Sequence, residues 1–555
     1  MYLENIEILG FRGINRLSLM LADNTVLIGE NAWGKSSLLD ALSLLLAPAM
    51  PLYHFGLQDF YFKPGDENSR ERHLQVIFTF CETAAGHHLT PRYRSLKHVW
   101  VKGGDASLHR IFYRLEGEVD ESQAVCTWRS FLDAQGHPIS LNDINALARE
   151  IIRLHPVLRL RDARFMRRLR AGSLAVTLDN GSEKLAQQFE QLMRELAKNP
   201  QKLSDKELRQ GLVAIRQLLE HYFSELSAVS CERHQRHERV HSGKSWRSLD
   251  NINRLIADPN SRSRRIILLE LFSTLLQAKG SVVLDPHARP LLLIEDPETR
   301  LHPIMLSVAW RLLMQLPLQK ITTTNSGELL SLVPMEQVCR LVRESSRVAT
   351  FRIGPQGMSA EDSRRIAFHI RFNRPASLFA RCWLLVEGET EVWMLNELAR
   401  QCGHHFEAEG IKVIEFAQSG LRPLVKFAQR MGIEWHVLVD GDDAGKKYAA
   451  LAKSMLSVTQ GDSERDHLTV LPASDMEHYM YREGFSHVYH RIAQLPEKVP
   501  LSMHKIIVKA IHRSSKPDLA IEVAMEAARM GSDAVPPLIR STFSRVLWLA
   551  RGRAD

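Results

Sequence analysis

Eight residues close to the N-terminus have the types and spacing of a phosphate-binding loop. They read GENAWGKS, from Gly29 to Ser36, and match G-x-x-x-x-G-K-[ST] at every defined position. The run NTVLIG precedes them and SSLLDALSLLL follows, so we expect the loop to join a strand to a helix. There backbone N–H groups point at phosphates, Lys35 would bridge the β- and γ-phosphates, and Ser36 would hold Mg²⁺. The sequence therefore predicts a site for ATP with Mg²⁺, whose candidate contacts are Gly29, Asn31, Gly34, Lys35, Ser36 and Ser37.

A second motif supplies the carboxylates that an ATPase needs. The run LLLIEDPETRLHP lies about 260 residues after the phosphate loop. Its four apolar residues predict a buried strand, with Glu295 and Asp296 at the carboxyl end. We expect Glu295 to support Mg²⁺ and Asp296 to polarise the attacking water. A lone acidic turn is the alternative, and the particular run around the pair argues against it.

Three further groups of acids follow apolar strands near the C-terminus. They are Glu387, Glu389 and Glu391 in CWLLVEGETE, Asp440, Asp442 and Asp443 in WHVLVDGDDAG, and Asp475 and Glu477 in LPASDMEHY. The carboxyl ends of parallel strands meet at one sheet edge, so these acids can converge there. Oxygen ligands without His or Cys favour Mg²⁺ or Mn²⁺, and a cation offsets the repulsion between packed carboxylates. Two such ions could clamp the attacking and leaving oxygens of a phosphodiester. A surface acidic turn is the alternative for the Asp440 group, and the preceding HVLV strand disfavours it.

The elements that must position these residues alternate between strand and helix. At 555 residues the chain is too long for one core. The charge of 72 − 64 = +8 permits a DNA partner without proving one. The six cysteines form no CxxC, no run of 18 apolar residues exists, and the acidic, strand-like start is no signal peptide. The sequence therefore predicts a cytoplasmic α/β protein with no membrane contact.

The pattern divides the chain into five parts. They are 1–140 and 261–375 for two parts of an ATPase, 141–260 for a helical insertion, 376–480 for a small parallel α/β domain, and 481–555 for a helical tail. The insertion shows apolar residues at three- and four-residue spacing without heptads. It either packs on the core or serves as a dimerisation arm. The segment 153–170 is rich in arginine, and is either a DNA-backbone contact or an exposed face paired with acids.

The first two motifs together resemble the ABC-type ATPases of the SMC and RecF kind. The features are the FRG of Phe11–Gly13, the long gap between the ATP motifs and the EDPETRLHP run. The resemblance implies a nucleotide held between two heads, hence a homodimer or composite dimer. It also implies that Arg12 lies near the nucleotide and that Glu298 to His302 face the other subunit.

Two positions depart from that family. Its switch histidine is replaced by Asn325, which can bond a phosphate oxygen but cannot carry a proton or a charge. Its serine-glycine signature corresponds to ADPNSRSRR, where Ser261 or Ser263 could serve but the glycines are missing. We therefore expect slow hydrolysis. Gln58 is a candidate for the loop that reaches Mg²⁺ and water, with an exposed amide as the alternative.

The C-terminal acids, in VEGETE and VDGDDAG, resemble the TOPRIM domain. An ABC-type ATPase followed by TOPRIM is the layout of the OLD (overcoming lysogenisation defect) family, and the opening residues and TTNSGELLSL look closest to its YbjD-like members. The resemblance implies that Glu387 is a metal ligand or general base. It implies that metal is also held by Glu391, Asp440, Asp442 and Glu477. The family uses a tail lysine, which Lys516 matches, to stabilise the transition state; a solvated lysine is the alternative.

The leading interpretation is an ATP-binding, metal-dependent DNA endonuclease whose ATPase controls dimer geometry. Its predicted catalytic residues are Asp296, Glu387 and Lys516, and its predicted partners are DNA, a second copy of the chain and possibly another protein. The alternative is a nucleotide-switched DNA-binding or scaffold protein with a slow ATPase and a partner-dependent or absent nuclease. A strand-rejoining TOPRIM enzyme is a third reading, but no tyrosine sits in a recognisable module.

Overall fold

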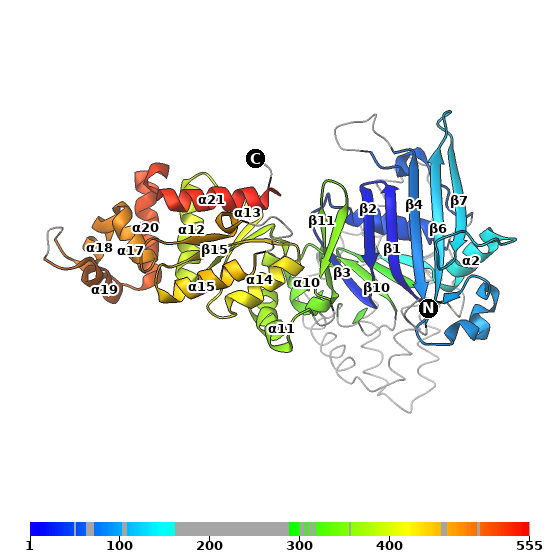
Figure 1. The fold of residues 1–555 in the computed structure, drawn as a ribbon, viewed down its shortest axis with the longest axis horizontal. Coiled ribbons are helices and arrows are strands. Elements are labelled where there is room, and N and C mark those ends of the chain that lie inside the picture. The colour runs from blue at the N-terminus through cyan, green and yellow to red at the C-terminus, as the bar shows by residue number, and fades with distance from the viewer. Residues whose placement is uncertain are drawn as a thin grey trace, which may run out of the picture. The chain divides into compact units, whose positions relative to one another are not determined.

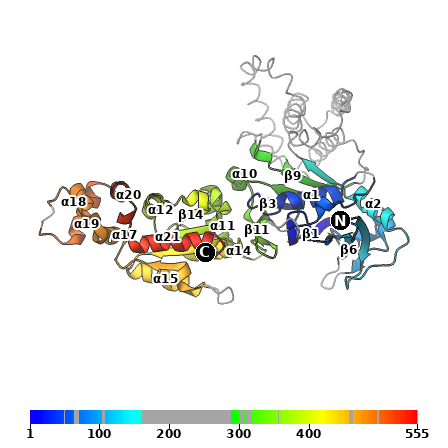
Figure 2. The ribbon, with the colours of Figure 1, turned by 90° about the horizontal axis from the view of Figure 1, so that it is seen from above.

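The fold is described from a computed structural model of the chain (Figures 1 and 2). The described residues are 1–48, 51–62, 71–102, 108–160, 288–299, 306–307, 310, 313–314, 318–354, 357–456, 463–496 and 500–553. The chain splits into two compact units, Met1–Thr350 and Phe351–Asp555. Most of the predicted helical insertion, with Ser261 and Ser263, lies outside the described residues, as does His302.

The N-terminal unit is built on a sheet of twelve strands in the order β5-β6-β4-β1-β2-β12-β11-β3-β10-β9-β8, with β7 paired to β6. Its antiparallel part comprises β1 (Tyr2–Phe11), β2 (Ile14–Met20), β4 (His73–Cys81), β5 (Val101–Lys102), β6 (His109–Val119) and β7 (Val125–Leu132). These strands alternate buried apolar and more exposed side chains, because one face packs on the core and the other does not.

The phosphate-loop strand lies in the parallel part of the same sheet. This part comprises β3 (Asn24–Ile28), β8 (Val157–Leu160), β9 (Leu291–Glu295), β10 (Lys320–Thr323) and β11 (Val338–Arg343), and β12 (Val348–Arg352) pairs in parallel with β2. The four leucine and isoleucine residues of β9 are all buried, as expected for a strand covered on both faces.

The helical prediction for 141–260 needs one correction. Helix α2 (Ile144–Leu154) begins as expected, with Asp143 as its N-cap. It ends before Pro156, and the chain then forms the strand β8, which pairs with β9. Proline disfavours helix in the residue before it, and the short run VLRL gains its strand identity from the tertiary pairing with β9.

The C-terminal unit contains a four-stranded parallel sheet in the order β14-β13-β15-β16. The strands are β13 (Cys382–Val386), β14 (Ile411–Glu415), β15 (Glu434–Val439) and β16 (Leu468–Val470). On one face Leu384 belongs to the same core as Met394 of α12 (Glu389–Gln401) and Phe543 of α21 (Pro537–Ala550). On the other face Trp383 stacks on Phe427 of α14 (Leu421–Arg430). The sheet is therefore covered by helices on both faces.

The other helices among the described residues are divided between the two units. They are α1 (Lys35–Leu45) and α10 (Gly327–Leu332) in the first, and α11 (Ala360–Ile366), α13 (Phe406–Glu409), α15 (Asp443–Ser454), α16 (Glu464–His467), α17 (Met476–Met480), α18 (Ser486–Ala493), α19 (Met503–Arg513) and α20 (Lys516–Met530) in the second. The segment predicted as a helical tail, 481–555, contains α18, α19, α20 and α21. Among the described residues, no helix has both the length and the apolarity that crossing a membrane requires.

Candidate nucleotide and metal sites

The phosphate loop has the predicted strand–loop–helix context. Strand β3 ends at Ile28, Gly29 follows with φ +148°, and Gly34 (φ +94°) caps α1. A side chain at Gly29 would bring its Cβ within 2.7 Å of the Leu341 carbonyl oxygen, so the tight approach of loop and β11 requires glycine. The loop therefore leads directly into the N-terminus of α1, the end of a helix at which phosphates bind.

Lys35 is buried beneath this loop and is only 5% exposed. Its ammonium donates to the Gly29 carbonyl oxygen and, at 2.7 Å, to Oδ1 of Asn325. Burial lowers the pKa of Lys35, while the charges of Asp296 and Glu298 oppose that shift. The structure thus brings the predicted phosphate lysine together with the predicted replacement for the switch histidine.

Asp296, one of the two acids predicted for the second ATP motif, lies close to the phosphate loop. Asp296 adopts φ +42°, its N–H donates to the Thr323 carbonyl oxygen at 3.1 Å, and Thr323 Oγ1 donates to its carboxylate at 3.1 Å. Burial raises the pKa of Asp296, and the hydrogen bond from Thr323 and the charge of Lys35 oppose the rise. Next to it, Glu298 accepts from the Asn325 N–H at 2.8 Å. Asp296 and Glu298 therefore both face the phosphate-loop lysine.

Glu295 instead belongs to a chain of alternating charges. Arg159 of β8 donates to both carboxylate oxygens of Glu295, at 3.0 Å each, and also to Asp40 of α1. Asp40 in turn accepts from Arg12, whose Nε donates to Asp59 at 2.9 Å. With its side chain 9% exposed, Arg159 is an interior ion-pair residue and not a surface DNA contact. This network was missed by sequence reasoning, because only the pairing of β8 with β9 brings Arg159 to Glu295.

The other predicted nucleotide residues lie around the same loop. Ser36 is exposed at the start of α1, as is Asn31 in the loop, whereas the Ser37 hydroxyl accepts from the Gly13 N–H at 3.2 Å. Gln58 is exposed in the turn Leu57–Asp59, one residue from the partner of Arg12. The turn is joined to the FRG segment, since the Arg12 N–H donates to the Asp59 carbonyl oxygen at 2.8 Å.

The acids predicted to bind metal in the C-terminal unit also converge. Glu387 follows β13, and its Oε1 accepts from the Asp440 N–H at the end of β15, at 3.2 Å. Glu391, one turn along α12, caps that helix by accepting from the Gly388 N–H at 3.0 Å. Because the chain passes from β13 to β14 on one side and returns to β15 on the other, the acids lie at a topological switch point, where such sheets bind ligands.

The electrostatics confirm that these carboxylates face one another. Burial, followed by the charges of Glu387 and Glu391, raises the pKa of Asp440 to about 8. Burial also raises the pKa of Glu387 and Glu391, with Asp442 contributing to the first and Glu477 to the second. An all-carboxylate set that repels itself fits a hard divalent cation such as Mg²⁺ or Mn²⁺.

Lys516 is the positively charged side chain that was predicted to lie beside these acids. It lies at the start of α20, and its Nζ is 3.0 Å from Oε1 of Glu477, which is buried on α17. Burial lowers the pKa of Lys516, but the charge and hydrogen bond of Glu477 and the charges of Asp475 and Glu391 together outweigh burial and raise the pKa. The structure therefore brings the tail lysine to the acids.

A neighbouring histidine pair was not predicted. Asp475 accepts from Nδ1 of His478 at 2.6 Å, and His478 Nε2 lies 3.3 Å from Nδ1 of His504 on α19. No sequence pattern indicates this pair, since its members come from two separate helices.

Two glycines shape the loop that carries the aspartates. A Cβ at Gly441 would lie 2.4 Å from the Ala473 carbonyl oxygen, and one at Gly445 would lie 1.9 Å from the carbonyl oxygen of Asp440. Asp442 caps α15 between them, accepting from the Gly445 N–H at 2.7 Å. Close backbone packing therefore requires both glycines of the DGDDAG run.

Taken with the two sheets, these sites define a phosphate-loop head of an ATPase-like kind, followed by a domain of the TOPRIM type. Residues 1–377 match the family described as "Protein of unknown function (DUF2813)", and residues 378–442 match "Overcoming lysogenization defect protein-like, TOPRIM domain". A relative from Escherichia coli (strain K12), "Uncharacterized protein YbjD", is 68% identical over 556 residues and covers the whole of both chains. The chain therefore belongs to this YbjD-like family, with an OLD-like TOPRIM domain.

Solved structures with partial likeness fall into two groups. The C-terminal region of the Burkholderia pseudomallei OLD protein is 20% identical, with a TM-score of 0.25, over 32% of this chain and 98% of that one. The SMC head domain from Thermotoga maritima is 11% identical, with a TM-score of 0.30, over 64% of this chain and 100% of that one. The two sheets, the matched TOPRIM model and the C-terminal helices confirm the predicted α/β fold class with a parallel-sheet TOPRIM domain and a helical tail.

Proposed function

We propose that the protein is an ATP-binding DNA endonuclease that hydrolyses phosphodiester bonds at the TOPRIM acids. The observation that carries the proposal is the convergence of five carboxylates and Lys516 at one sheet edge. The carboxylates belong to Glu387, Glu391, Asp440, Asp442 and Glu477. Without a cation Asp440, with a pKa of about 8, retains a proton at neutral pH, and such crowding of carboxylates is costly for a purely structural role.

The carboxylates and Lys516 would have separate roles in phosphodiester hydrolysis. Bound Mg²⁺ or Mn²⁺ would polarise the phosphate and supply a hydroxide-like nucleophile. The five carboxylates hold the ions, with Glu387 also placed to accept a proton from the attacking water. Lys516 lies beside Glu477, where its charge would stabilise the negative charge that develops on the phosphate.

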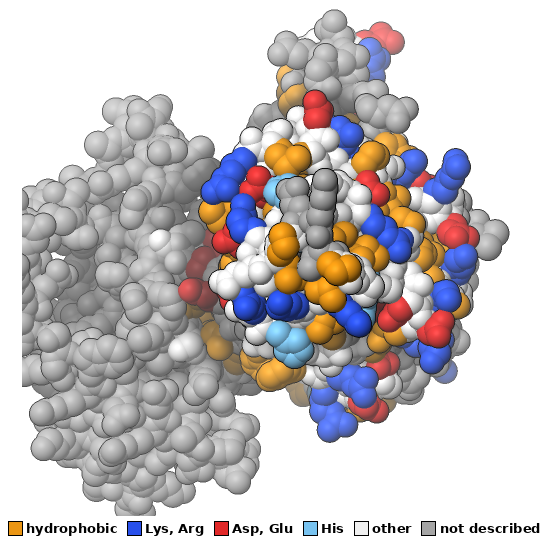
Figure 3. Space-filling view, turned by 90° about the vertical axis from the view of Figure 1, so that its left-hand side faces the viewer, with side chains coloured by type: hydrophobic (Ala, Val, Ile, Leu, Met, Phe, Trp, Pro, Cys, Tyr) orange, Lys and Arg blue, Asp and Glu red, His pale blue; other side chains and the backbone are white. Residues whose placement is uncertain are grey.

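A basic helix next to the acids offers a contact for the DNA backbone. Helix α19 carries His504, Lys505, Lys509 and Arg513 and has no acidic residue. Among the described residues, Lys505, Lys509 and Arg513 make no ion pair, so their charges are available to phosphates. This end of the unit, with α18, α19 and α20, faces the viewer in Figure 3, where basic side chains are interspersed with hydrophobic ones.

The ATPase head would control the nuclease by changing its dimer geometry. Lys35, buried at the phosphate loop, would bind the phosphates, and Asp296 would polarise the attacking water. Ser36, at the start of α1, would hold Mg²⁺ with support from Glu295. In this conformation Arg159 occupies both oxygens of Glu295, so support through a water molecule fits better than direct ligation. ATP bound between two copies would join the heads.

The test is plasmid nicking in Mg²⁺ or Mn²⁺, with and without ATP, by the full-length protein. Asp440→Ala should abolish cleavage, because it removes the carboxylate at the centre of the cluster. Asp443→Ala is the matched control, since this neighbouring aspartate is 93% exposed and pairs with Lys446. Lys35→Ala shows whether cleavage depends on ATP. Cleavage retained by Asp440→Ala, or absent from the wild type on every DNA form, would defeat the proposal.

A second function is favoured by Asn325. Its amide bonds Lys35 where the related ATPases place an ionisable histidine, so hydrolysis would be slow and the ATP-bound state long-lived. The protein would then act as a nucleotide-switched DNA-binding or scaffold protein. ATP-dependent, salt-sensitive retention of DNA without strand breaks would support this function, and DNA binding indifferent to ATP would oppose it.

A further inference from the structure

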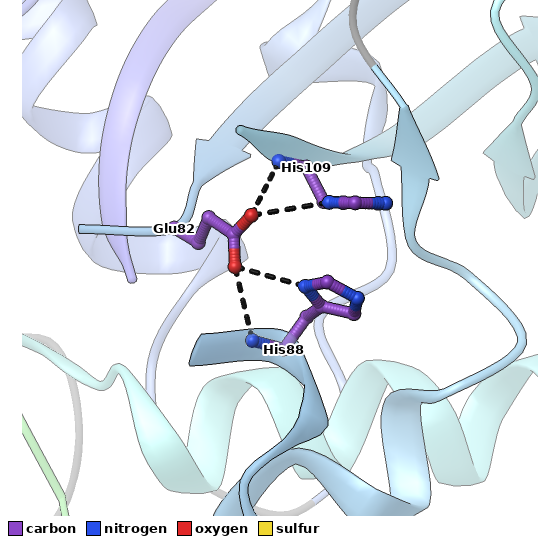
Figure 4. A group of neighbouring side chains, drawn as sticks. All are labelled: Glu82, His88 and His109. Carbon is purple, nitrogen blue, oxygen red and sulfur yellow. Dashed lines mark hydrogen bonds and ion pairs between the residues drawn. The ribbon is translucent and has the colours of Figure 1, made fainter. Parts of the chain in front are cut away.

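Three side chains with metal-binding chemistry meet in the N-terminal unit. Glu82 directly follows β4, His88 lies in the turn His87–Leu89, and His109 is the first residue of β6 (Figure 4). One ligand atom from each lies within 4.8 Å of the other two. The group is made of two imidazoles and one carboxylate, unlike the all-carboxylate TOPRIM cluster.

The carboxylate at the centre is fully buried and held in place by backbone. The N–H groups of His109 and His88 donate to Glu82 at 2.7 and 3.0 Å, one to each oxygen. A buried carboxylate, held by two backbone N–H groups, therefore lies beside the two imidazole rings.

Both imidazoles turn the same nitrogen toward that carboxylate. Nδ1 of His88 lies 3.0 Å from one oxygen of Glu82, and Nδ1 of His109 lies 3.1 Å from the other. The ring centroids are 3.8 Å apart. One divalent ion bound by the two nitrogens and the carboxylate would offset the buried charge of Glu82.

We propose that Glu82, His88 and His109 bind one divalent first-row transition metal of the zinc class. Imidazole nitrogen with carboxylate oxygen is a ligand set suited to such ions, with bonds of about 2.0–2.2 Å. Oxygen–nitrogen separations of 3.0 and 3.1 Å can be bridged by an ion at that range. The His88 and His109 side chains are 17% and 24% exposed, so an ion can enter and water can complete its shell.

The bound ion would join three separate segments of the head. It would tie the turn that carries His88 to the ends of β4 and β6, which are already paired with each other in the sheet. The metal would therefore brace this end of the sheet, independently of the nuclease proposed above.

Glutamine variants separate metal binding from hydrogen bonding. In His88→Gln and His109→Gln the new amide can still donate to Glu82, but a nitrogen that binds zinc is lost. His87→Gln is the matched control, because His87 is the adjacent histidine and its ring bonds the Thr83 hydroxyl at 2.7 Å instead.

Zinc would be counted on the full-length chain. Protein stripped with EDTA is equilibrated with Zn²⁺ in excess Mg²⁺, which occupies the carboxylate cluster, and bound zinc is measured by mass spectrometry. We expect His88→Gln and His109→Gln to bind one equivalent fewer than the wild type, and His87→Gln to bind the same amount. The zinc-dependent rise in Tm should be lost in the first two variants only.

Equal zinc content in all four proteins would overturn the proposal and leave Glu82 as a structural acceptor. If the glutamine variants fail to fold in EDTA, the proposal is tested instead by Co²⁺ binding to the wild-type protein. A visible absorption band typical of Co²⁺ with nitrogen ligands, displaced by one equivalent of Zn²⁺, supports the site, and its absence overturns it.

Discussion

Binding of Mn²⁺ to the TOPRIM acids should release a proton in a strongly pH-dependent way. Burial and the charges of Glu387 and Glu391 raise the pKa of Asp440 from its ordinary value of 3.8 to about 8. Below about pH 8 the metal-free carboxyl therefore carries a proton, which a cation must displace. From that pKa, about 0.9 proton should leave per binding event at pH 7, and about 0.1 at pH 9.

The same reasoning fixes the apparent affinity. The dissociation constant should rise about tenfold between pH 9 and pH 7, and about tenfold again at pH 6. The free energy of unfolding of the metal-free protein should change with pH in the opposite direction to the affinity for metal. Because folding raises the pKa of Asp440 above 3.8, the folded form holds the extra proton, and stability should fall as the pH rises from about 4 to about 8.

Calorimetric titration with Mn²⁺ in buffers of different ionisation enthalpy measures the proton release directly. Asp440→Asn should bind more weakly and release almost no proton at pH 7. Asp442→Asn is the control, because this exposed aspartate is a predicted ligand whose loss should weaken binding but leave the proton release in place. Equal proton release at pH 7 by the wild type and Asp440→Asn would refute the reasoning.

Three further outcomes are expected. Lys35→Ala should reduce ATP hydrolysis by about 10³-fold or more, because it removes the buried ammonium placed for the phosphates; unchanged turnover in a phosphate-release assay would count against the site. Arg159→Met should destabilise the head by about 2–3 kcal/mol, a value between those for exposed and buried ion pairs, because it leaves Glu295 without its cation. Urea denaturation of this variant, of Glu295→Gln and of the double variant should show that the two losses of stability are non-additive. Lys516→Ala should slow DNA cleavage about 10²–10³-fold at saturating metal, and a loss that extra Mn²⁺ restores would assign Lys516 to ordering Glu477 instead.

Local motifs made much of the site predictable. The phosphate loop fixes its own backbone, so Gly29 to Ser36 implied the strand and the helix around it. The convergence of Glu387 with Asp440 followed from parallel-strand topology, because both residues follow buried strands of one sheet. In both cases the information lies within a short segment or in the regular geometry of a sheet.

What could not be predicted depends on contacts between distant segments. Arg159 resembled a surface arginine in a basic stretch, yet β8 brings it to Glu295, which is 136 residues away. Glu82 and His109 are 27 residues apart in sequence and share no motif spacing. Their neighbours in sequence carry no pattern that distinguishes a ligand from an ordinary polar residue, so only the tertiary structure brings these groups together.

In the DGDDAG loop the two glycines are required by the fold, whereas the aspartates are required by the proposed chemistry, so the two can be lost separately in evolution. Side chains at Gly441 or Gly445 would collide with main-chain oxygens, whatever reaction the domain performs. Selection against misfolding should therefore preserve both glycines in descendants that have lost the aspartates. A relative that retains the glycines and carries neutral residues at the positions of Asp440 and Asp442 would be a folded pseudoenzyme. Recognition of such a lineage by sequence would rest on its glycines, while its acids would report whether it still cuts.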